Sequence, residues 1–333
     1  MKKFLAGALA AVMTVSLAAC GSSSTAETTA AETEAAEEST EAEAEEAASE
    51  EIKTVEEGKL TVATSPDFAP YEFYAIDENG DPQLAGFDMD LAQYIADYLG
   101  LELEIIPMDF DGTIMELSQG NVDLGMAGYS PSPEREDVMD FSDIYITGGQ
   151  SFVCRKDNAD KFTSLEDTNK SDLIIGAQVG SIQANLAKEN SPEADIIEMA
   201  KVTDIIADLL AGKMDGAYIE TMVAESYAKN YPDLDIVLEV PYDAEGSVVG
   251  VSKGNEALLK GVNEAIAKCI ADGTLNDYVA KANELASGDI IEGLVSDTAE
   301  AETEAAAETE AADAAEETEA EAAAEAETEA ESK

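Results

Sequence analysis

The chain has 333 residues and a formal net charge of −55 at pH 7, with 18 basic residues, 73 acidic residues and no histidine. A charge of this sign repels polyanions, so the composition argues against a nucleic-acid partner and against adhesion to anionic lipid head groups. The absence of histidine excludes histidine-based acid–base catalysis, and no Cys-x-x-Cys pair is present. The sequence therefore predicts no metal site and no cofactor.

The first twenty residues have the pattern of a bacterial export signal. Lys2 and Lys3 precede an apolar run at 4–19, and Leu-Ala-Ala stands directly before Cys20. A basic start, a short apolar segment and small residues are typical of a secretory signal. The end of the run resembles a lipobox, which implies cleavage before Cys20 and acylation of its thiol. We therefore expect 1–20 to be a lipoprotein signal peptide, and the protein to be exported and lipid-anchored to the outer face of the cytoplasmic membrane. An ordinary signal peptide with an incidental cysteine is the alternative.

Two acidic segments flank the part of the chain that can fold. Residues 21–56 and 293–333 consist almost entirely of alanine, glutamate, threonine and serine. Such segments cannot bury enough apolar surface to offset the entropy lost on ordering. We expect 21–56 to be a disordered acidic tether that spaces a folded domain from the membrane, and 293–333 to be a disordered acidic C-terminal tail.

Between these segments, strand patterns alternate with helix patterns, which predicts an α/β fold with largely parallel sheets covered on both faces. We expect strands at 59–64, 101–107, 122–127, 150–155, 173–178, 214–219, 236–240 and 247–251, and a turn followed by a strand at 67–74. We expect helices at 86–99, 164–167, 182–188, 203–210, 221–229, 256–271 and 276–285, and a further helix that stops at Gly120-Asn121. Cys154 and Cys269 fall within apolar stretches, so two buried thiols are favoured over a disulfide between them.

The loop after the strand at 122–127 is the first candidate for a binding site. Residues 128–133 contain two prolines and cannot continue a regular element, so the loop places small polar groups and then Arg135 beyond the end of a strand. Ligands bind at this position in open α/β sheets. Arg135 and Arg155 are the only arginines, and a guanidinium grips a planar carboxylate with two parallel hydrogen bonds. A surface arginine paired with Glu134 or Glu136 is the alternative.

The ordered motifs of the region 57–290 resemble bacterial extracellular solute-binding protein family 3, the substrate-binding lipoproteins of ABC transporters for polar amino acids. The motifs are Phe68-Ala69-Pro70-Tyr71-Glu72-Phe73, Gly86-Phe87-Asp88-Met89-Asp90-Leu91-Ala92, Pro107-Met108-Asp109-Phe110, the segment 123–135, Asp140-Phe141-Ser142-Asp143, the segment 176–181, the segment 215–217 and Ala271-Asp272-Gly273-Thr274. The resemblance implies a two-lobed type II periplasmic-binding-protein fold. Residues 57–145 plus 247–292 would form the first lobe and 150–241 the second. The crossovers at 145–149 and 242–246 would be hinges that close the lobes on a ligand.

The same resemblance implies a monomer that captures a free polar amino acid and delivers it to the permease subunits of the transporter. Arg135 would hold the carboxylate with the Ser130 hydroxyl, and the carbonyl around Gly128 would accept from the ammonium. From the second lobe, Ser181 and the N–H of Ile182 would contact the carboxylate at a helix start. A plain N-cap is the alternative for Ser181.

Glu220 stands where the family commonly has an aspartate for the ligand's ammonium. Its alternative is a first-turn carboxylate for the helix that starts at Thr221. Phe68 and Phe110 match aromatic residues that pack on the ligand's side chain in family members. A place in the hydrophobic core is the alternative for both. Selectivity would come from Ser65, Phe68, Tyr71 and Gln178. Several members with basic ligands have an acid where Ser65 stands, so the resemblance favours a neutral polar ligand such as glutamine or cystine.

Three other interpretations of these residues compete with this one. The pairs Asp88/Asp90 and Asp109/Asp111 are better explained as helix-start charges, or as acids beside a cleft-facing Phe110, than as metal or paired-carboxylate sites. The fold also hosts cyclohexadienyl dehydratases, in which an acid such as Glu220 would act on a leaving hydroxyl, but no further ionisable group of the needed kind accompanies it. A surface amino-acid sensor without a transporter is the third possibility.

Overall fold

The structure is a computed structural model that describes residues 52–77, 79–242 and 246–287. The expected signal peptide with Cys20, the expected tail at 293–333 and most of the expected tether lie outside the described residues. Among the residues that the structure describes, no helix is both long enough and apolar enough to cross a membrane.

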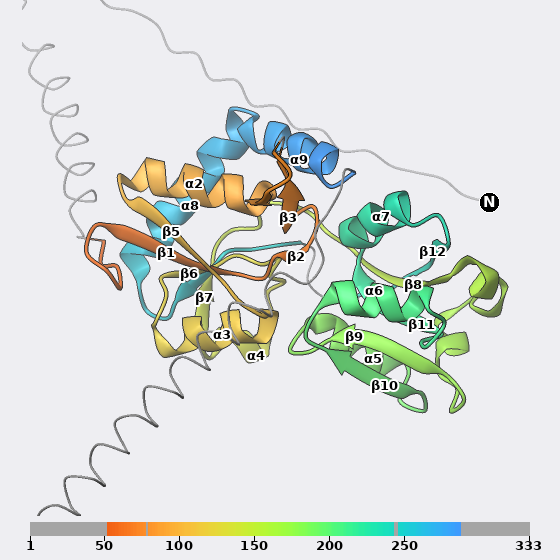
Figure 1. Cartoon of the computed structure of the whole chain (residues 1–333). Helices are drawn as coiled ribbons and strands as arrows, with labels where there is room; N and C mark the ends of the chain where they lie inside the picture. The colour runs from red at the N-terminus through yellow and green to blue at the C-terminus, as the bar shows by residue number, and fades with distance from the viewer. Residues whose placement is uncertain (1–51, 78, 243–245, 288–333) are drawn as a thin grey trace, which may run out of the picture. The chain divides into compact units, whose positions relative to one another are not determined.

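The first lobe is built on a five-stranded sheet with the order β5-β1-β6-β13-β7 (Figure 1). Its strands are β1 (Lys59–Thr64), β5 (Glu102–Pro107), β6 (Leu124–Gly125), β7 (Met139–Phe141) and β13 (Gly250–Ser252). β1 is parallel to β5 and β6, whereas β13 is antiparallel to β6 and β7. A small antiparallel sheet joins β2 (Asp67–Phe68), β3 (Glu72–Ile76) and β4 (Pro82–Ala85).

Helices cover both faces of the first sheet because successive side chains of a strand point to opposite sides. The helices are α2 (Phe87–Leu99), α3 (Phe110–Gln119), α4 (Pro133–Glu136), α8 (Glu256–Ala271) and α9 (Thr274–Leu285). Val62 belongs to a buried cluster with Phe87 of α2 and Val262 of α8. The next residue, Ala63, belongs to another cluster with Leu117 of α3. Figure 1 shows α2, α8 and α9 on one side of this sheet and α3 and α4 on the other.

The second lobe repeats this layering on a sheet with the order β10-β9-β11-β8-β12. Its elements are β8 (Gln150–Arg155), the short helices η1 (Lys156–Lys161) and η2 (Leu165–Thr168), β9 (Ile174–Gln178), α5 (Ile182–Asn190), β10 (Asp195–Met199), α6 (Val202–Leu210), β11 (Gly216–Glu220), α7 (Thr221–Asn230) and β12 (Leu234–Glu239). Ala217 of β11 clusters with Ile205 of α6 and Val223 of α7. Tyr218 clusters with Leu186 of α5 on the opposite face. The buried Cys154 and Cys269 are both unpaired.

Two crossover segments connect the lobes and lie side by side. One follows β7 and enters β8, and the other leaves β12 and returns to β13. Ile146 and Ser247 form an isolated antiparallel bridge between them. A Cβ atom on Gly246 would lie 2.4 Å from the Ile146 carbonyl oxygen, so only glycine permits this close approach. This paired connection confirms the two-lobed fold with two crossovers.

Two strands are shorter than their apolar runs predicted. The run 122–127 pairs only at Leu124 and Gly125, because the chain turns away at Gly128, where φ is 58°. The run 247–251 enters its sheet only at Gly250. Edge strand β10 was not predicted, because its Asp and Glu side chains interrupt the apolar pattern.

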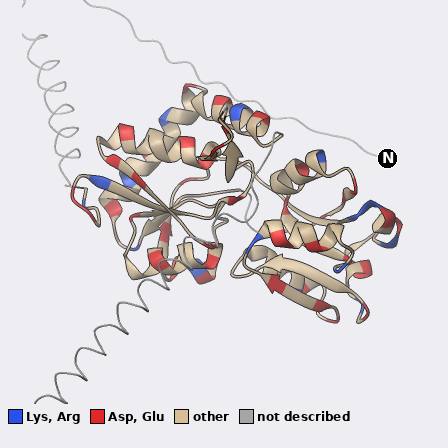
Figure 2. Ribbon diagram, in the orientation of Figure 1, with Lys and Arg blue, Asp and Glu red and all other residues tan. Residues whose placement is uncertain are grey.

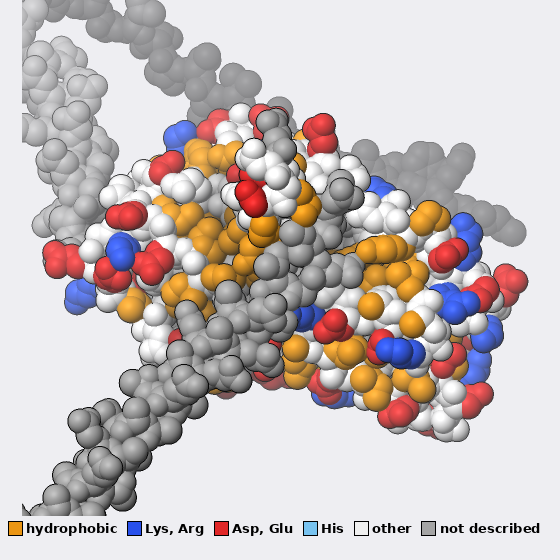
Figure 3. Space-filling model, viewed as in Figure 1, with side chains coloured by type: hydrophobic (Ala, Val, Ile, Leu, Met, Phe, Trp, Pro, Cys, Tyr) orange, Lys and Arg blue, Asp and Glu red, His pale blue; other side chains and the backbone are white. Residues whose placement is uncertain are grey.

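Charge is spread over both lobes rather than concentrated on one. Figure 2 shows acidic residues on helices and loops of each lobe, with fewer lysines and arginines among them. On the face seen in Figure 3, apolar, acidic and basic side chains are interspersed over both lobes. The surface charge therefore says little about the ligand, which must be read from buried groups.

Candidate functional site

Arg135 is a buried guanidinium at the boundary between the lobes. It lies on α4, whose first position is Pro133, and only 7% of the residue is exposed. Nη1 donates to the Ser130 carbonyl at 2.9 Å, and Nη2 donates to the Gly180 carbonyl of the second lobe at 3.1 Å. The guanidinium carbon lies 5.4 Å from the centre of the Phe110 ring and 5.5 Å from that of Tyr129. These contacts hold the fork against two aromatic rings, which pack edge to face on each other, and aim it at the second lobe.

No carboxylate neutralises this guanidinium in the described part of the chain. The ion pairs formed by described residues do not include Arg135, and Glu134 and Glu136 are exposed. The alternative of a surface arginine paired with those glutamates is therefore wrong. Burial lowers the pKa of the Arg135 guanidinium, since the charged form has lost water without gaining a full anionic partner. A site of this kind favours a bound anion.

Glu220 ends β11 and caps α7, and its two carboxylate oxygens have different surroundings. Oε2 accepts from the Val223 N–H at 2.9 Å. Oε1 is buried and has no hydrogen-bond partner among the described residues. A Cβ atom on Gly148 would lie 3.0 Å from Oε1 and 3.6 Å from the Tyr71 hydroxyl, so all three residues meet at the first crossover. The helix-cap alternative thus accounts for Oε2 and leaves Oε1 available for a ligand.

The pKa of Glu220 reflects this uncompensated burial. Only 3% of the residue is exposed. Burial raises the pKa of its carboxyl to about 7, although backbone N–H groups and the Tyr71 hydroxyl act in the opposite direction. A cationic group beside Oε1 would restore the ionised form. The ammonium of an amino acid is such a group.

Phe68, Tyr71 and Gly128 form one aromatic corner of the first lobe. The rings of Phe68 and Tyr71 lie 5.5 Å apart. A Cβ atom on Gly128 would approach the Phe68 ring to 2.7 Å, so a side chain at this position would displace the ring. The Gly128 N–H donates to Asp88 Oδ2 at 3.2 Å, and the Tyr145 hydroxyl donates to Asp88 Oδ1 at 2.7 Å. Asp88 lies in the first turn of α2, as expected, and its fully buried carboxylate also holds the loop.

The turn between β9 and α5 carries the predicted residues of the second lobe. The Ser181 hydroxyl accepts from the Ala184 N–H at 3.1 Å and donates to the Gln178 carbonyl at 2.6 Å. Ser181 is therefore the N-cap of α5, as its alternative interpretation held. Ile182 begins α5 and is half-buried. The ligand contacts predicted for Ser181 and Ile182 stay predictions.

Sequence reasoning missed Asp67, which links Ser65 of the first lobe to Gln178 of the second. The Ser65 hydroxyl donates to Asp67 Oδ1 at 2.8 Å, and Gln178 Nε2 donates to Asp67 Oδ2 at 3.2 Å. Gln178 Nε2 also donates to the Ala200 carbonyl at 3.0 Å. The position of Asp67, directly before the predicted site residue Phe68, was the one available signal.

The predicted residues thus form three contacting groups at the lobe boundary. Arg135 contacts Ser130, Phe110 and the Gly180 carbonyl that precedes Ser181. Phe68, Tyr71 and Gly128 pack together, and the Tyr71 hydroxyl lies near Glu220 Oε1. Ser65 and Gln178 share Asp67. No three His, Cys, Asp or Glu residues of the described ranges cluster as metal ligands would.

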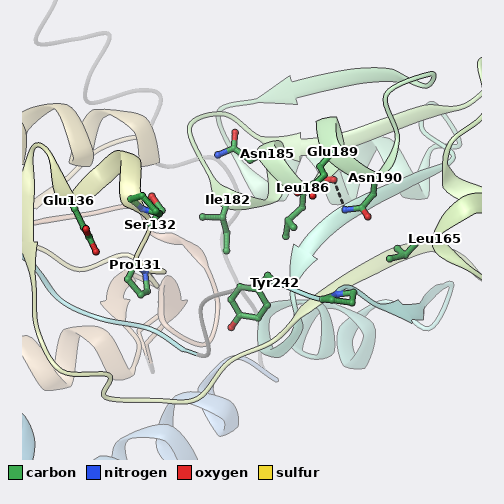
Figure 4. A pocket seen from close by; sticks show the side chains of 12 residues that line it. Pro131, Ser132, Glu136, Leu165, Ile182, Asn185, Leu186, Glu189, Asn190 and Tyr242 are labelled. Carbon is green, nitrogen blue, oxygen red and sulfur yellow. Dashed lines mark hydrogen bonds between the residues drawn. The ribbon is translucent and has the colours of Figure 1, made fainter.

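A groove of 640 Å³ runs between the lobes beside the contact of Arg135 with Gly180. Ser132 and Glu136 line it from the first lobe, Ile182 and Asn185 from α5, and Tyr242 from the second crossover. Figure 4 shows Ile182 and Ser132 on opposite sides of this space. The boundary between the lobes is therefore open next to the predicted ligand contacts.

Residues 60–283 match the model of the family described as bacterial extracellular solute-binding proteins, family 3. The arginine-binding extracellular protein ArtP of Bacillus subtilis is 32% identical, over 84% of this chain and 98% of that protein. The L-cystine-binding protein TcyJ of Escherichia coli is 28% identical, over 67% of this chain and 82% of that protein.

Solved structures show the same fold. The amino acid ABC transporter substrate-binding protein AbpA from Streptococcus pneumoniae, bound to L-arginine, superposes with a TM-score of 0.67. It is 33% identical, over 70% of this chain and 97% of that chain.

An enzyme is also among the relatives. Cyclohexadienyl dehydratase of Pseudomonas aeruginosa is 27% identical, over 57% of this chain and 70% of that protein. The relatives with higher identity are binding proteins, so the comparisons favour capture of a ligand over its conversion.

Proposed function

We propose that Arg135 and Glu220 hold the two charged ends of one amino acid. The premise is that the chain belongs to the bacterial extracellular solute-binding proteins, family 3, as its match over residues 60–283 shows. The protein captures a polar amino acid for an ABC transporter, as its relatives do. Arg135 would bind the α-carboxylate and Glu220 Oε1 the α-ammonium. One group comes from each lobe, so a ligand that satisfies both favours the closed arrangement.

The observation that carries this proposal is the buried guanidinium without a carboxylate partner. A buried charge is costly unless it is paired, and Arg135 has only two neutral carbonyls. On the second lobe, Oε1 of Glu220 is buried without a hydrogen-bond partner among the described residues, so it can accept from a cationic group. An α-amino acid provides both missing partners on a single carbon atom.

The remaining predicted contacts complete the proposed site. Phe68, Tyr71 and Phe110 would surround the aliphatic part of the ligand, and the Ser130 hydroxyl would join Arg135 at the carboxylate. We propose that the lobes, at 57–145 plus 247–292 and at 150–241, move about the two crossovers. In the open form the Gly180 carbonyl would leave Arg135, and the ligand would take its place.

The family is described as extracellular, so the protein acts outside the cell. We propose that a lipid on Cys20 anchors it to the outer face of the cytoplasmic membrane. It would work there as a monomer that hands its ligand to permease subunits.

A dehydratase is the second candidate function, because a carboxyl with a pKa of about 7 suits a general acid. Incubation with prephenate or arogenate, followed by an absorbance scan, tests it. Formation of an aromatic product would identify an enzyme. Unchanged substrate would support the binding protein.

Calorimetry with modified amino acids tests the proposed site. The purified chain is unfolded and refolded to remove any ligand carried through purification, and is then titrated with the twenty amino acids and cystine. The best ligand is compared with its α-amide, which lacks the carboxylate, and with its N-acetyl derivative, which lacks the ammonium. Each derivative should bind at least about 30-fold more weakly, since each leaves one buried charge unpaired. Equal binding of either derivative would contradict the assignment of the matching residue.

A further inference from the structure

Asp67 is a second buried carboxylate at the lobe boundary, and the α-groups of a ligand do not account for it. It lies on β2 and is 6% exposed. Oδ2 accepts from the Val202 N–H at 2.5 Å and from Gln178 Nε2 at 3.2 Å, while Oδ1 accepts from the Ser65 hydroxyl. Val202 and Gln178 belong to the second lobe. The carboxylate thus faces the second lobe from the first, as Arg135 does.

No cation of the described ranges pairs with Asp67. It is absent from the ion pairs, and Lys201, which precedes Val202, forms none with it. The start of α6 at Val202 supplies only a partial positive charge, about half an elementary charge. Burial raises the pKa of the Asp67 carboxyl to about 6, and repulsion from Asp109 acts in the same direction. The site therefore holds an acid whose charge is incompletely balanced.

The proposed ligand leaves four buried acids of the described ranges without a counter-charge. Arg135 is matched by the α-carboxylate and Glu220 by the α-ammonium. The other buried acids, which form no ion pair, are Asp67, Glu72, Asp88 and Asp123. Of these, Asp67 is the one whose carboxylate accepts hydrogen bonds from the second lobe. A positive group at the far end of the ligand's side chain would neutralise Asp67.

The spacing along one turn agrees with this arrangement. Gln178 contacts Asp67, and Gly180, two residues later, contacts Arg135. Two residues span at most about 7 Å of chain. One short turn of the second lobe therefore touches both the carboxylate end and the Asp67 end of the proposed site.

We infer that Asp67 receives the positively charged end of the ligand's side chain, so that the protein selects a cationic amino acid of the arginine or lysine type. This inference rests on the proposed roles of Arg135 and Glu220. It reverses the expectation of a neutral ligand that was based on Ser65. Ser65 carries no charge itself, but its hydroxyl donates to Asp67, which places a carboxylate in the site two residues further along.

A pair of ligands that differ in one charge tests the inference on the unmodified protein. L-arginine and L-citrulline have nearly the same shape and the same α-groups, but citrulline has a neutral side chain. The refolded chain should bind arginine at least about 30-fold more tightly than citrulline by calorimetry. Equal affinity, or a preference for citrulline, glutamine or cystine, would overturn the inference.

Variants then assign the preference to Asp67. Asp67→Asn keeps an acceptor for the Val202 N–H, so it should lower the arginine preference to less than about threefold and leave citrulline affinity within a few-fold. Asp111→Asn is the control, because it makes the same change in net charge at an exposed position. Asp111 lies on α3, close to Gly180 of the second lobe. Equal losses for both ligands in Asp67→Asn, or the same loss of preference in Asp111→Asn, would refute the role of Asp67.

The two proposals fail in different ways. If no α-amino acid binds, or if binding survives removal of Arg135, the proposed function fails. If α-amino acids bind through Arg135 without a preference for a cationic side chain, only the inference about Asp67 fails.

Discussion

Replacement of Arg135 by alanine removes the guanidinium on which the proposed site depends. The residue is 7% exposed and packs beside the rings of Phe110 and Tyr129, so alanine leaves a buried cavity next to both rings. A ligand carboxylate in that cavity would be buried without a counter-charge. Loss of one partner from a buried, hydrogen-bonded charge pair costs about 2–5 kcal/mol of binding free energy. This range corresponds to a weakening of about 30-fold to about 4,000-fold in Kd.

The ligand-free protein should respond much less. Arg135 donates there to two carbonyls, those of Ser130 and Gly180, and both acceptors can rebind water in the cavity that alanine creates. Arg135→Lys keeps the charge but loses the planar fork, and we expect an affinity between those of the wild type and the alanine variant. Arg155→Ala is the matched control, because Arg155 is the only other arginine, is partly exposed and pairs with the exposed Asp157.

Calorimetry with the best ligand measures the change, and thermal unfolding without ligand reports whether the variant is folded. A loss of less than tenfold in a folded Arg135→Ala protein would refute the assignment of the carboxylate site. A comparable loss in Arg155→Ala would show that net charge, rather than a specific contact, governs binding.

Three further predictions concern other parts of the chain. Because the pKa of Glu220 is raised, the folded state binds the Glu220 proton more tightly than the unfolded chain does. This group should therefore lower the unfolding free energy of the ligand-free protein by about 3 kcal/mol as pH rises from about 4.5 to about 7. Glu220→Gln should lack that part of the loss in urea titrations at the two pH values; identical pH dependence in both proteins would disprove it. Deletion of 296–333 should leave Kd and melting temperature nearly unchanged, because the sequence of that segment offers no apolar face for packing, and a large drop in either would contradict this. Cys20→Ser should move the protein from the detergent phase to the aqueous phase in a phase-partition assay, and retention in the detergent phase would exclude a lipid on Cys20.

Periodicity predicted the order of the main elements because most of them bury one continuous face. The helix ending at Gly120 and the buried strands β1, β9 and β11 carry that signal in their own residues. Edge strand β10 does not, since three of its five residues are exposed, none is buried and two are acidic. The run 122–127 overstated its strand, because the chain turns away at Gly128, where φ is 58° and the ring of Phe68, distant in sequence, occupies the place of a side chain.

The candidate site was predicted where one residue type carried the chemistry. Arg135 was found because a guanidinium in a proline-rich loop after a strand is unusual in this lysine-dominated chain. Asp67 was missed because its partners Gln178 and Val202 follow it by 111 and 135 residues. Glu220 was interpreted as both a cap and a ligand group, and the separate environments of its two oxygens allow both descriptions. Only the folded chain distinguishes such cases.

The Gly180 carbonyl accepts a hydrogen bond from the guanidinium that the proposed site offers to a carboxylate. Under the proposed function a ligand has to displace this carbonyl, so the lost contact subtracts from the affinity that the other contacts could deliver. The same contact would stabilise closure of the lobes without a ligand. A permease that recognised only the closed outline would then accept unloaded protein as readily as loaded protein.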